Sequence, residues 1–134
     1  MSNNPIEEVL KNMPGNGSTE WENTFYGCLA ECGVWDTEKF WFFHRALTQI
    51  GELVQQDTDV DRNLVYALLY IQHGVLTHIG SHFDPRVDWK VESIDDEDLQ
   101  EYAERFQIAV LSAISGKVMS ESSFDLTNPL LCNT

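Results

Sequence analysis

Three histidines and an aspartate stand close together in the middle of the chain, and these residue types suit metal binding. His73, His78 and His82 are followed by Asp84. His78 and His82 are four residues apart, so they share one face of any helix that continues past residue 80. A histidine pair at this spacing can hold zinc, but the metalloprotease pattern places a general-base glutamate directly after the first histidine. Here Ile79 takes that position.

The geometry of a helix further weakens the case for a metal site. At 100° per residue, His73 points about 140° away from His78. We therefore interpret these side chains as structural histidines, with His78 hydrogen-bonded near the end of its helix. We predict neither a metal nor another cofactor. A metal-dependent helical-bundle enzyme built on His78 and His82 is kept as an alternative.

Other catalytic patterns are missing from the sequence. There is no Gly-x-Ser-x-Gly elbow and no glycine-rich phosphate loop with its lysine. Carboxylate pairs are little evidence for acid–base catalysis in a chain with 22 aspartates and glutamates. They cluster near expected helix starts, where they offset the helix dipole. We predict that the protein is not an enzyme.

Surface chemistry points instead to partner binding. Trp41 falls opposite the apolar stripe of its expected helix, on a face with charged neighbours, which predicts an interface anchor. The alternative is that Trp41 packs against the C-terminal tail or the first short helix. The stripe itself consists of Phe40, Phe43, Leu47 and Ile50.

Two acidic clusters are the other candidate binding residues. Glu97, Glu101 and Glu104 share the outward side of the last expected helix with Ile108 and Leu111, a combination that can steer a basic partner and then bury apolar area. The alternative is a solvated face whose far end touches the tail. The second cluster lies near the start of the preceding helix and comprises Asp57, Asp59 and Asp61. Whether the two clusters adjoin is left open by the sequence.

The elements that would position these residues are helices. Apolar residues recur at helical spacing over residues 19–33, 36–55, 58–79 and 93–116, and a short helix is expected over residues 5–13. Thr19 and Glu22 have the spacing of a capping box that would start the first of these long helices, and Asp36 is expected to cap the second. Gly33 and Gly116 are expected helix ends. The sequence therefore predicts an all-α fold, a bundle of four long helices plus a short N-terminal helix.

The whole chain, residues 1–134, is expected to form one helical domain, with less regular tails over residues 1–18 and 117–134. Residues 80–93 form the longest connection, in which Val87, Trp89 and Val91 alternate with charged residues. Three alternating residues are weak support for a strand, so we expect an ordered loop whose apolar side chains lie on the bundle.

Composition limits the classes of function. Hydrophobic residues make up 43% of the chain, enough for a core, and 22 acidic against 8 basic residues give a formal net charge of −14. Such a charge repels nucleic acid and anionic lipid and attracts basic surfaces. The odd count of three cysteines and the lack of an apolar run of about 18 residues predict a protein of the reducing cytoplasm, without a membrane span.

One segment resembles a known family. The sequence Phe-Tyr-Gly-Cys-Leu-Ala-Glu-Cys-Gly-Val-Trp-Asp over residues 25–36 is similar to a segment in immunity proteins of bacterial polymorphic toxin systems. In that family a Gly-Cys-Leu-like helix end, a Gly-x-Trp-Asp turn and an aromatic-rich helix follow one another. The resemblance extends loosely over residues 20–110 and transfers no functional residue.

The resemblance implies an immunity protein, as in contact-dependent growth inhibition, that binds a cognate toxin domain and blocks its active site. Many such toxins are nucleases with basic clefts, so the expected partner is a basic protein, with no direct binding of nucleic acid or membrane. Besides the metal-dependent enzyme, two alternatives stay open: a nucleic-acid mimic that inhibits a host defence protein, and a homodimer that uses Trp41.

Overall fold

The computed structural model describes residues 4–15, 20–56 and 59–131. Its described residues form an all-α fold, as the sequence predicts. The α-helices are α1 (Pro5–Leu10), α2 (Phe25–Cys32), α3 (Thr37–Val54), α4 (Arg62–Phe83) and α5 (Asp96–Ser115). Short 3₁₀ turns lie at η1 (Trp21–Asn23), η2 (Glu121–Ser123) and η3 (Pro129–Leu131).

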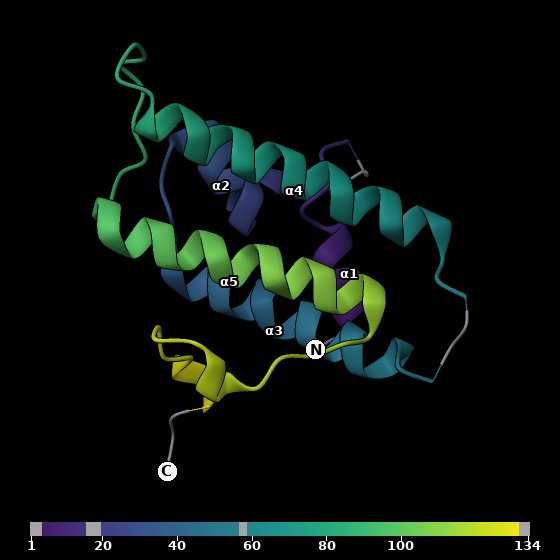
Figure 1. Cartoon of the computed structure of the whole chain (residues 1–134). Helices are drawn as coiled ribbons and strands as arrows, with labels where there is room; N and C mark the ends of the chain where they lie inside the picture. Colours follow the sequence, from purple (N-terminus) through teal and green to yellow (C-terminus); the bar gives the residue numbers. More distant parts are fainter. Residues whose placement is uncertain (1–3, 16–19, 57–58, 132–134) are drawn as a thin grey trace.

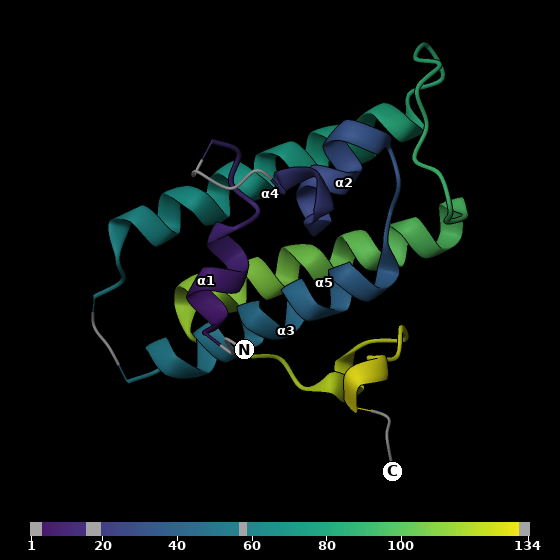
Figure 2. The same ribbon diagram turned by 180° about the vertical axis from the view of Figure 1, so that it is seen from behind.

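The three longest helices give the molecule its shape. α3 packs along α5, and α4 runs along the other side of α5 in the opposite chain direction (Figure 1). α1 and α2 lie across the back, where α1 contacts α3 and α2 contacts α4 (Figure 2). The segment after α5 returns along the bundle on the side away from α4. None of the helices in the described ranges is both long enough and apolar enough to cross a bilayer.

Aromatic side chains fill the centre of the bundle. Phe25 of α2 lies with its ring 5.0 Å from that of Trp35, 5.5 Å from that of Phe43 and 6.4 Å from that of Phe106. Each of these four residues is at most 2% exposed. Three helices and the turn between α2 and α3 therefore meet at one cluster, which fixes α5 relative to α3.

The predicted ends of several helices are confirmed. Asp36 caps α3 by accepting a hydrogen bond from the backbone N–H of Lys39 at 3.0 Å. Gly33 and Gly116 follow α2 and α5 with φ of 68° and 77°, a left-handed conformation that glycine adopts without a Cβ clash.

The second helix is shorter than the sequence predicts. Instead of a long helix from residue 19, α2 has eight residues and starts at Phe25. Thr24 is its cap and accepts from the N–H of Gly27 at 3.0 Å, so the expected capping box with Glu22 is not what starts it. The threonine of that expected box, Thr19, lies outside the described residues.

The expected bounds of the last two helices are also wrong. α4 starts at Arg62 and continues through Gly80 to Phe83, because Asp61 caps its first turn and the residues after Gly80 are held by His82. Asp61 is thus the cap, not a residue of the first turn. α5 starts at Asp96 rather than at Ser93, since Ser93 has a φ of +72° that no helix allows.

The connection between α4 and α5 is an ordered loop. Within it the backbone of Glu92 pairs with that of Gly33 and Trp35, in an isolated parallel bridge between Val34 and Glu92. Val91 is buried and Trp89 half-buried, as expected for apolar side chains that lie on the bundle.

Candidate functional site

A groove between the C-terminal part of α4 and the outward side of α5 is the candidate binding site. Its volume is about 800 Å³. Ile79 and Phe83 form the α4 wall. The α5 wall is longer and consists of Glu97, Gln100, Glu101, Ala103, Glu104, Gln107, Ile108 and Leu111. All five α5 residues that the sequence predicts to bind a partner therefore line one groove.

The spacing of these five residues explains their alignment. Positions 97, 101, 104, 108 and 111 are separated by four, three, four and three residues, which keeps them on one helical stripe. The stripe is about 21 Å long at 1.5 Å per residue. It changes from carboxylates near the start of α5 to apolar side chains further along, and Leu111 is 63% exposed.

Acidic residues also explain why α5 starts where it does. Asp95 caps the helix by accepting from the N–H of Asp98 at 2.8 Å, and Asp96, Glu97 and Asp98 occupy the first turn. Negative charge there is stabilised by the positive end of the helix dipole. The helix dipole therefore stabilises part of the negative charge of the groove, at Glu97, without a neighbouring cation.

The carboxylates of the groove are available to an external cation. Within the described ranges, Glu97, Glu101 and Glu104 form no ion pair, and no lysine or arginine lines the groove. Three carboxylates without an ion-pair partner, beside exposed apolar side chains, are complementary in charge and polarity to a basic, partly apolar protein segment.

His82 joins the two walls of the groove at its acidic end. The side chain is 7% exposed; its Nδ1 accepts from the backbone N–H of Val91 at 2.9 Å, and its Nε2 lies 2.7 Å from Oδ1 of Asp96. Because Nδ1 accepts a hydrogen bond, the ring proton lies on Nε2, which donates a hydrogen bond to Asp96. His82 thereby ties the end of α4 to both the loop and the start of α5.

Of the two other histidines in this group, only His78 is structural. It is hydrogen-bonded through Nδ1 to the carbonyl of Gly74 at 2.7 Å, as the sequence predicts. The prediction is wrong for His73, whose side chain is exposed. A metal ion could bind His82 only by breaking one of its two hydrogen bonds. No cluster of three or more potential metal ligands occurs in the part of the chain that the structure describes.

The prediction that Trp41 anchors an interface is wrong. Trp41 is 3% exposed, and its Nε1 donates to the hydroxyl of Tyr102 at 3.2 Å. The guanidinium of Arg105 lies 5.2 Å from the centre of its ring. Trp41 and Leu130 of the tail line one surface pocket. The buried face of α3 is wider than one stripe because both α5 and the tail cover it. The alternative that Trp41 packs against the tail is therefore confirmed.

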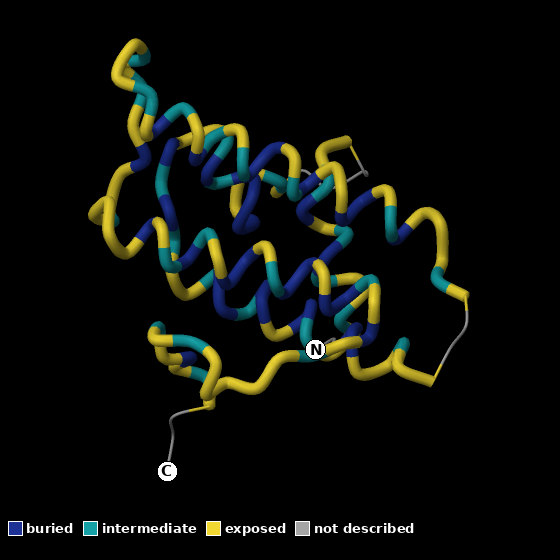
Figure 3. The backbone as a smooth tube through the Cα atoms, viewed as in Figure 1, coloured by how far each residue is buried: buried dark blue, intermediate teal, exposed yellow. Residues whose placement is uncertain are grey.

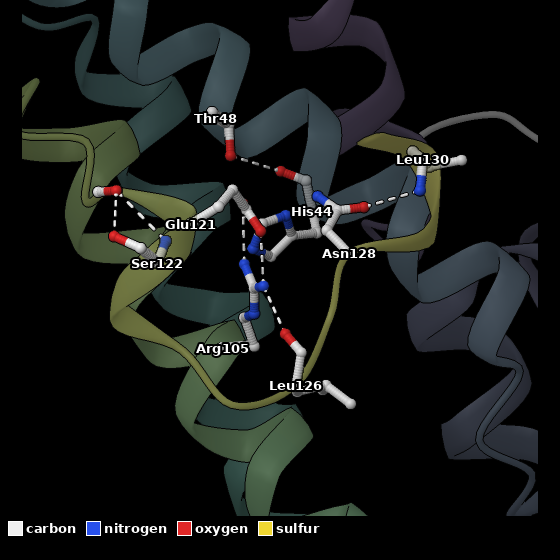
Figure 4. A network of polar contacts seen from close by, with 9 residues as sticks. His44, Thr48, Arg105, Glu121, Ser122, Leu126, Asn128 and Leu130 are labelled. Atoms are coloured by element: carbon white, nitrogen blue, oxygen red, sulfur yellow. Dashed lines mark hydrogen bonds and ion pairs between the residues drawn. The ribbon is translucent and has the colours of Figure 1, made fainter. Parts of the chain in front are cut away.

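Beside Trp41, Arg105 of α5 binds Glu121 and Leu126 of the C-terminal tail, and we call this contact the latch (Figure 4). Arg105 is 1% exposed and donates to both carboxylate oxygens of Glu121, at 3.0 and 2.7 Å, and to the carbonyl of Leu126 at 2.6 Å. The ring of Phe124 lies 4.1 Å from the guanidinium. The bidentate contact to Arg105 lowers the pKa of Glu121 below its ordinary value.

His44 lies beside this latch and is 5% exposed. Burial, followed by the nearby charge of Arg105, lowers the pKa of His44 to about 4. The imidazole is therefore neutral at pH 7. The sequence gives little indication of the latch, since Arg105 and Glu121 are 16 residues apart and on different elements. The one available hint is that Arg105 stands three residues from core Tyr102 and four from core Ala109.

The second predicted acidic cluster does not join the groove. Asp61 caps the first turn of α4 by accepting from the N–H of Leu64 at 3.1 Å, and Asp59 is exposed. Asp57 lies outside the described residues. The groove contacts the opposite end of α4, and that helix of 22 residues is about 33 Å long. The two clusters therefore lie too far apart to form one compact site.

No family model, curated protein or solved structure matches this chain.

Proposed function

We propose that the protein is a cytoplasmic immunity protein that binds a basic toxin domain, most simply a nuclease, through the groove between α4 and α5. The observation that carries the proposal is the alignment of Glu97, Glu101 and Glu104 with Ile108 and Leu111 along one groove. The resemblance of residues 25–36 to immunity proteins supports the class of partner. Cys28 and Cys32 are free thiols, which agrees with a reducing compartment.

Inhibition follows from the chemistry of the groove. A nuclease holds phosphates with lysine and arginine side chains, and carboxylates can take the place of those phosphates in charge-assisted hydrogen bonds. The net charge of −14 accelerates the encounter with a basic surface. Burial of Leu111 and Phe83 then supplies a contact that salt does not weaken.

Charge reversal in the groove tests the proposal. We expect Glu97→Lys, Glu101→Lys and Glu104→Lys together to abolish capture of the partner, when tagged protein is incubated with native-source lysate and washed in high salt. The matched control reverses three exposed glutamates elsewhere, Glu22, Glu31 and Glu52, and changes the net charge equally. Thermal unfolding of both variants verifies that they fold.

The expected result is one basic protein, captured in stoichiometric amount by the wild type and the control but not by the groove variant. Addition of the purified protein should then inhibit the nuclease activity of that captured protein at a one-to-one ratio. Equal capture by both variants would show that the groove is not the site. A broad set of proteins that high salt removes would instead favour charge mimicry of nucleic acid.

A further inference from the structure

A small cavity beneath the tail is lined by two residues whose buried nitrogen atoms have no hydrogen-bond partner. Within the described residues, three buried side-chain nitrogen atoms are unpaired: Nε1 of Trp35 in the aromatic core, Nδ1 of His44 and Nε of Arg105. The last two residues line the same cavity and are 5% and 1% exposed. Figure 4 shows their side chains next to each other, one on α3 and one on α5.

The cavity has room for one small molecule. α3 and α5 form its inner walls, and the tail covers it through half-buried residues that include Val118 and Phe124. Most other residues of the tail are exposed (Figure 3). The volume of the cavity is about 20 Å³. A cavity needs about 10–15 Å³ to hold a water molecule, so one water fits and a larger ligand does not.

Two hydroxyl groups in the lining supply further hydrogen-bond acceptors. Oγ1 of Thr48 donates to the carbonyl of His44 at 3.2 Å, and Oγ of Ser112 donates to the carbonyl of Ile108 at 2.9 Å. Each hydroxyl has a single proton, which these bonds use, so its oxygen can still accept. Nε of Arg105, in contrast, can only donate. The lining therefore contains both donors and acceptors, whereas cavities that stay dry are apolar.

The charges around the cavity disfavour an ion. Glu121 binds both terminal nitrogens of Arg105, at 3.0 and 2.7 Å, and lines the cavity as well. An anion would therefore lie beside a carboxylate, and a cation beside a guanidinium, with unfavourable Coulomb energy in either case. His44 adds no charge at pH 7, since its pKa is about 4. The lining thus matches a neutral molecule that can both donate and accept.

We propose that one ordered water molecule binds in this cavity, where it accepts a hydrogen bond from Nε of Arg105 and is hydrogen-bonded to Nδ1 of His44. A third hydrogen bond goes to one of the two hydroxyl oxygens, which gives the water the usual number of about three partners. The water completes the latch, because it joins α3 to the arginine that holds the tail. It also gives a polar partner to His44, which stands against the rings of Phe40 and Trp41.

A crystal structure of the purified full chain, grown with sodium bromide in place of chloride, tests the proposal. We expect one peak of density within hydrogen-bond distance of both Nε of Arg105 and Nδ1 of His44, without an anomalous signal from bromide. A cavity without density would overturn the proposal. An anomalous peak at this position would also overturn it, because the site would then bind an anion.

Magnetic relaxation dispersion of the water signal provides a second test in solution, since it counts water molecules that stay bound much longer than surface water. His44→Phe keeps the ring but removes Nδ1, so we expect the count to fall by one. The matched control, His73→Phe, makes the same substitution at an exposed histidine and should leave the count unchanged. Thermal unfolding verifies that both variants fold.

Equal counts for the wild type and His44→Phe would contradict the assignment of His44 as a partner of the water. The crystal structure of the wild type tests the site even if His44→Phe does not fold. The water site does not depend on the proposed immunity function, and neither measurement involves the groove or its partner. The two proposals therefore fail separately.

Discussion

At the scale of single residues, Arg105 shows how a buried charge can be accommodated. Its guanidinium is covered by Trp41 on one element and Phe124 on another, and its donors reach Glu121 and the carbonyl of Leu126. A buried arginine is tolerated when a carboxylate matches its charge in this way, even though the Nε of Arg105 has no hydrogen-bond partner in the described structure. The latch therefore joins the tail to α5 through one side chain and keeps Trp41 covered.

The pH dependence of stability is expected to come largely from His44. Its pKa is about 4 in the folded protein, against about 6.5 in the unfolded chain. The unfolded chain therefore binds more protons between these values, and stability falls as pH decreases from about 6.5 towards 4. From pH 7 to pH 5 we expect a loss of roughly 2 kcal/mol, measured by urea unfolding.

His44→Phe is the matched comparison, because it keeps an aromatic ring against Phe40 and Trp41 but does not titrate. Its free energy of unfolding should depend much less on pH in this window, whatever its absolute value. Glu121, with its lowered pKa, adds a loss of stability only at still lower pH. If wild type and variant show the same slope, the titration of His44 is not the cause.

At the scale of elements, α4 combines a buried face and an exposed face. Its two glycines differ in how closely other residues surround them. A Cβ at Gly74 would lie 1.9 Å from the hydroxyl oxygen of Tyr26, whereas a Cβ at Gly80 would have open space around it. Gly74 thus permits the close approach of α2 to α4. Gly80 has no such role in the described structure.

Substitution of these two glycines by alanine should therefore change the stability of the protein in opposite directions. Gly80→Ala is expected to stabilise the protein by about 0.5–1 kcal/mol, because alanine loses less backbone entropy in a helix. Gly74→Ala should destabilise it by about 1–3 kcal/mol, since Tyr26 is buried and must shift. Thermal unfolding of both variants measures the difference; a gain in stability for Gly74→Ala would show that α2 and α4 are not packed this closely.

At the scale of the whole molecule, the charge is the dominant property. Every acidic residue in the described part of the chain is exposed or half-buried, and α4 contains none of them. Repulsion among them favours the unfolded chain, in which the charges are further apart. Folding is then stabilised by anything that screens them.

We expect the free energy of unfolding to rise by on the order of 1 kcal/mol, or about 4 °C in melting temperature, when sodium chloride is increased from low to high concentration. A variant with glutamine at Glu22, Glu31 and Glu52 has three fewer negative charges and should show a smaller rise. A melting temperature that salt leaves unchanged in both proteins would mean that the charges are already too far apart to repel.

Features that depend on neighbouring residues were determined by the sequence itself. Asp36 starts a helix, and Gly33 and Gly116 end helices, where predicted, because a cap needs only the backbone of its own turn. The stripe on α5 was predictable in the same way, since the spacing of its residues fixes their alignment whatever the helix packs against. The all-α class follows from this local periodicity.

Features that depend on contacts between distant segments were decided by the tertiary structure. Trp41 is buried because the tail returns over α3, and the tail is held by a pair of charges that no local pattern connects. Likewise, only packing determined which apolar side chains of α4 became core, such as Leu68 and Ile71, and which stayed exposed, such as Tyr66 and Leu69. The α5 stripe became one wall of a groove because α4, held by His82, supplied the other.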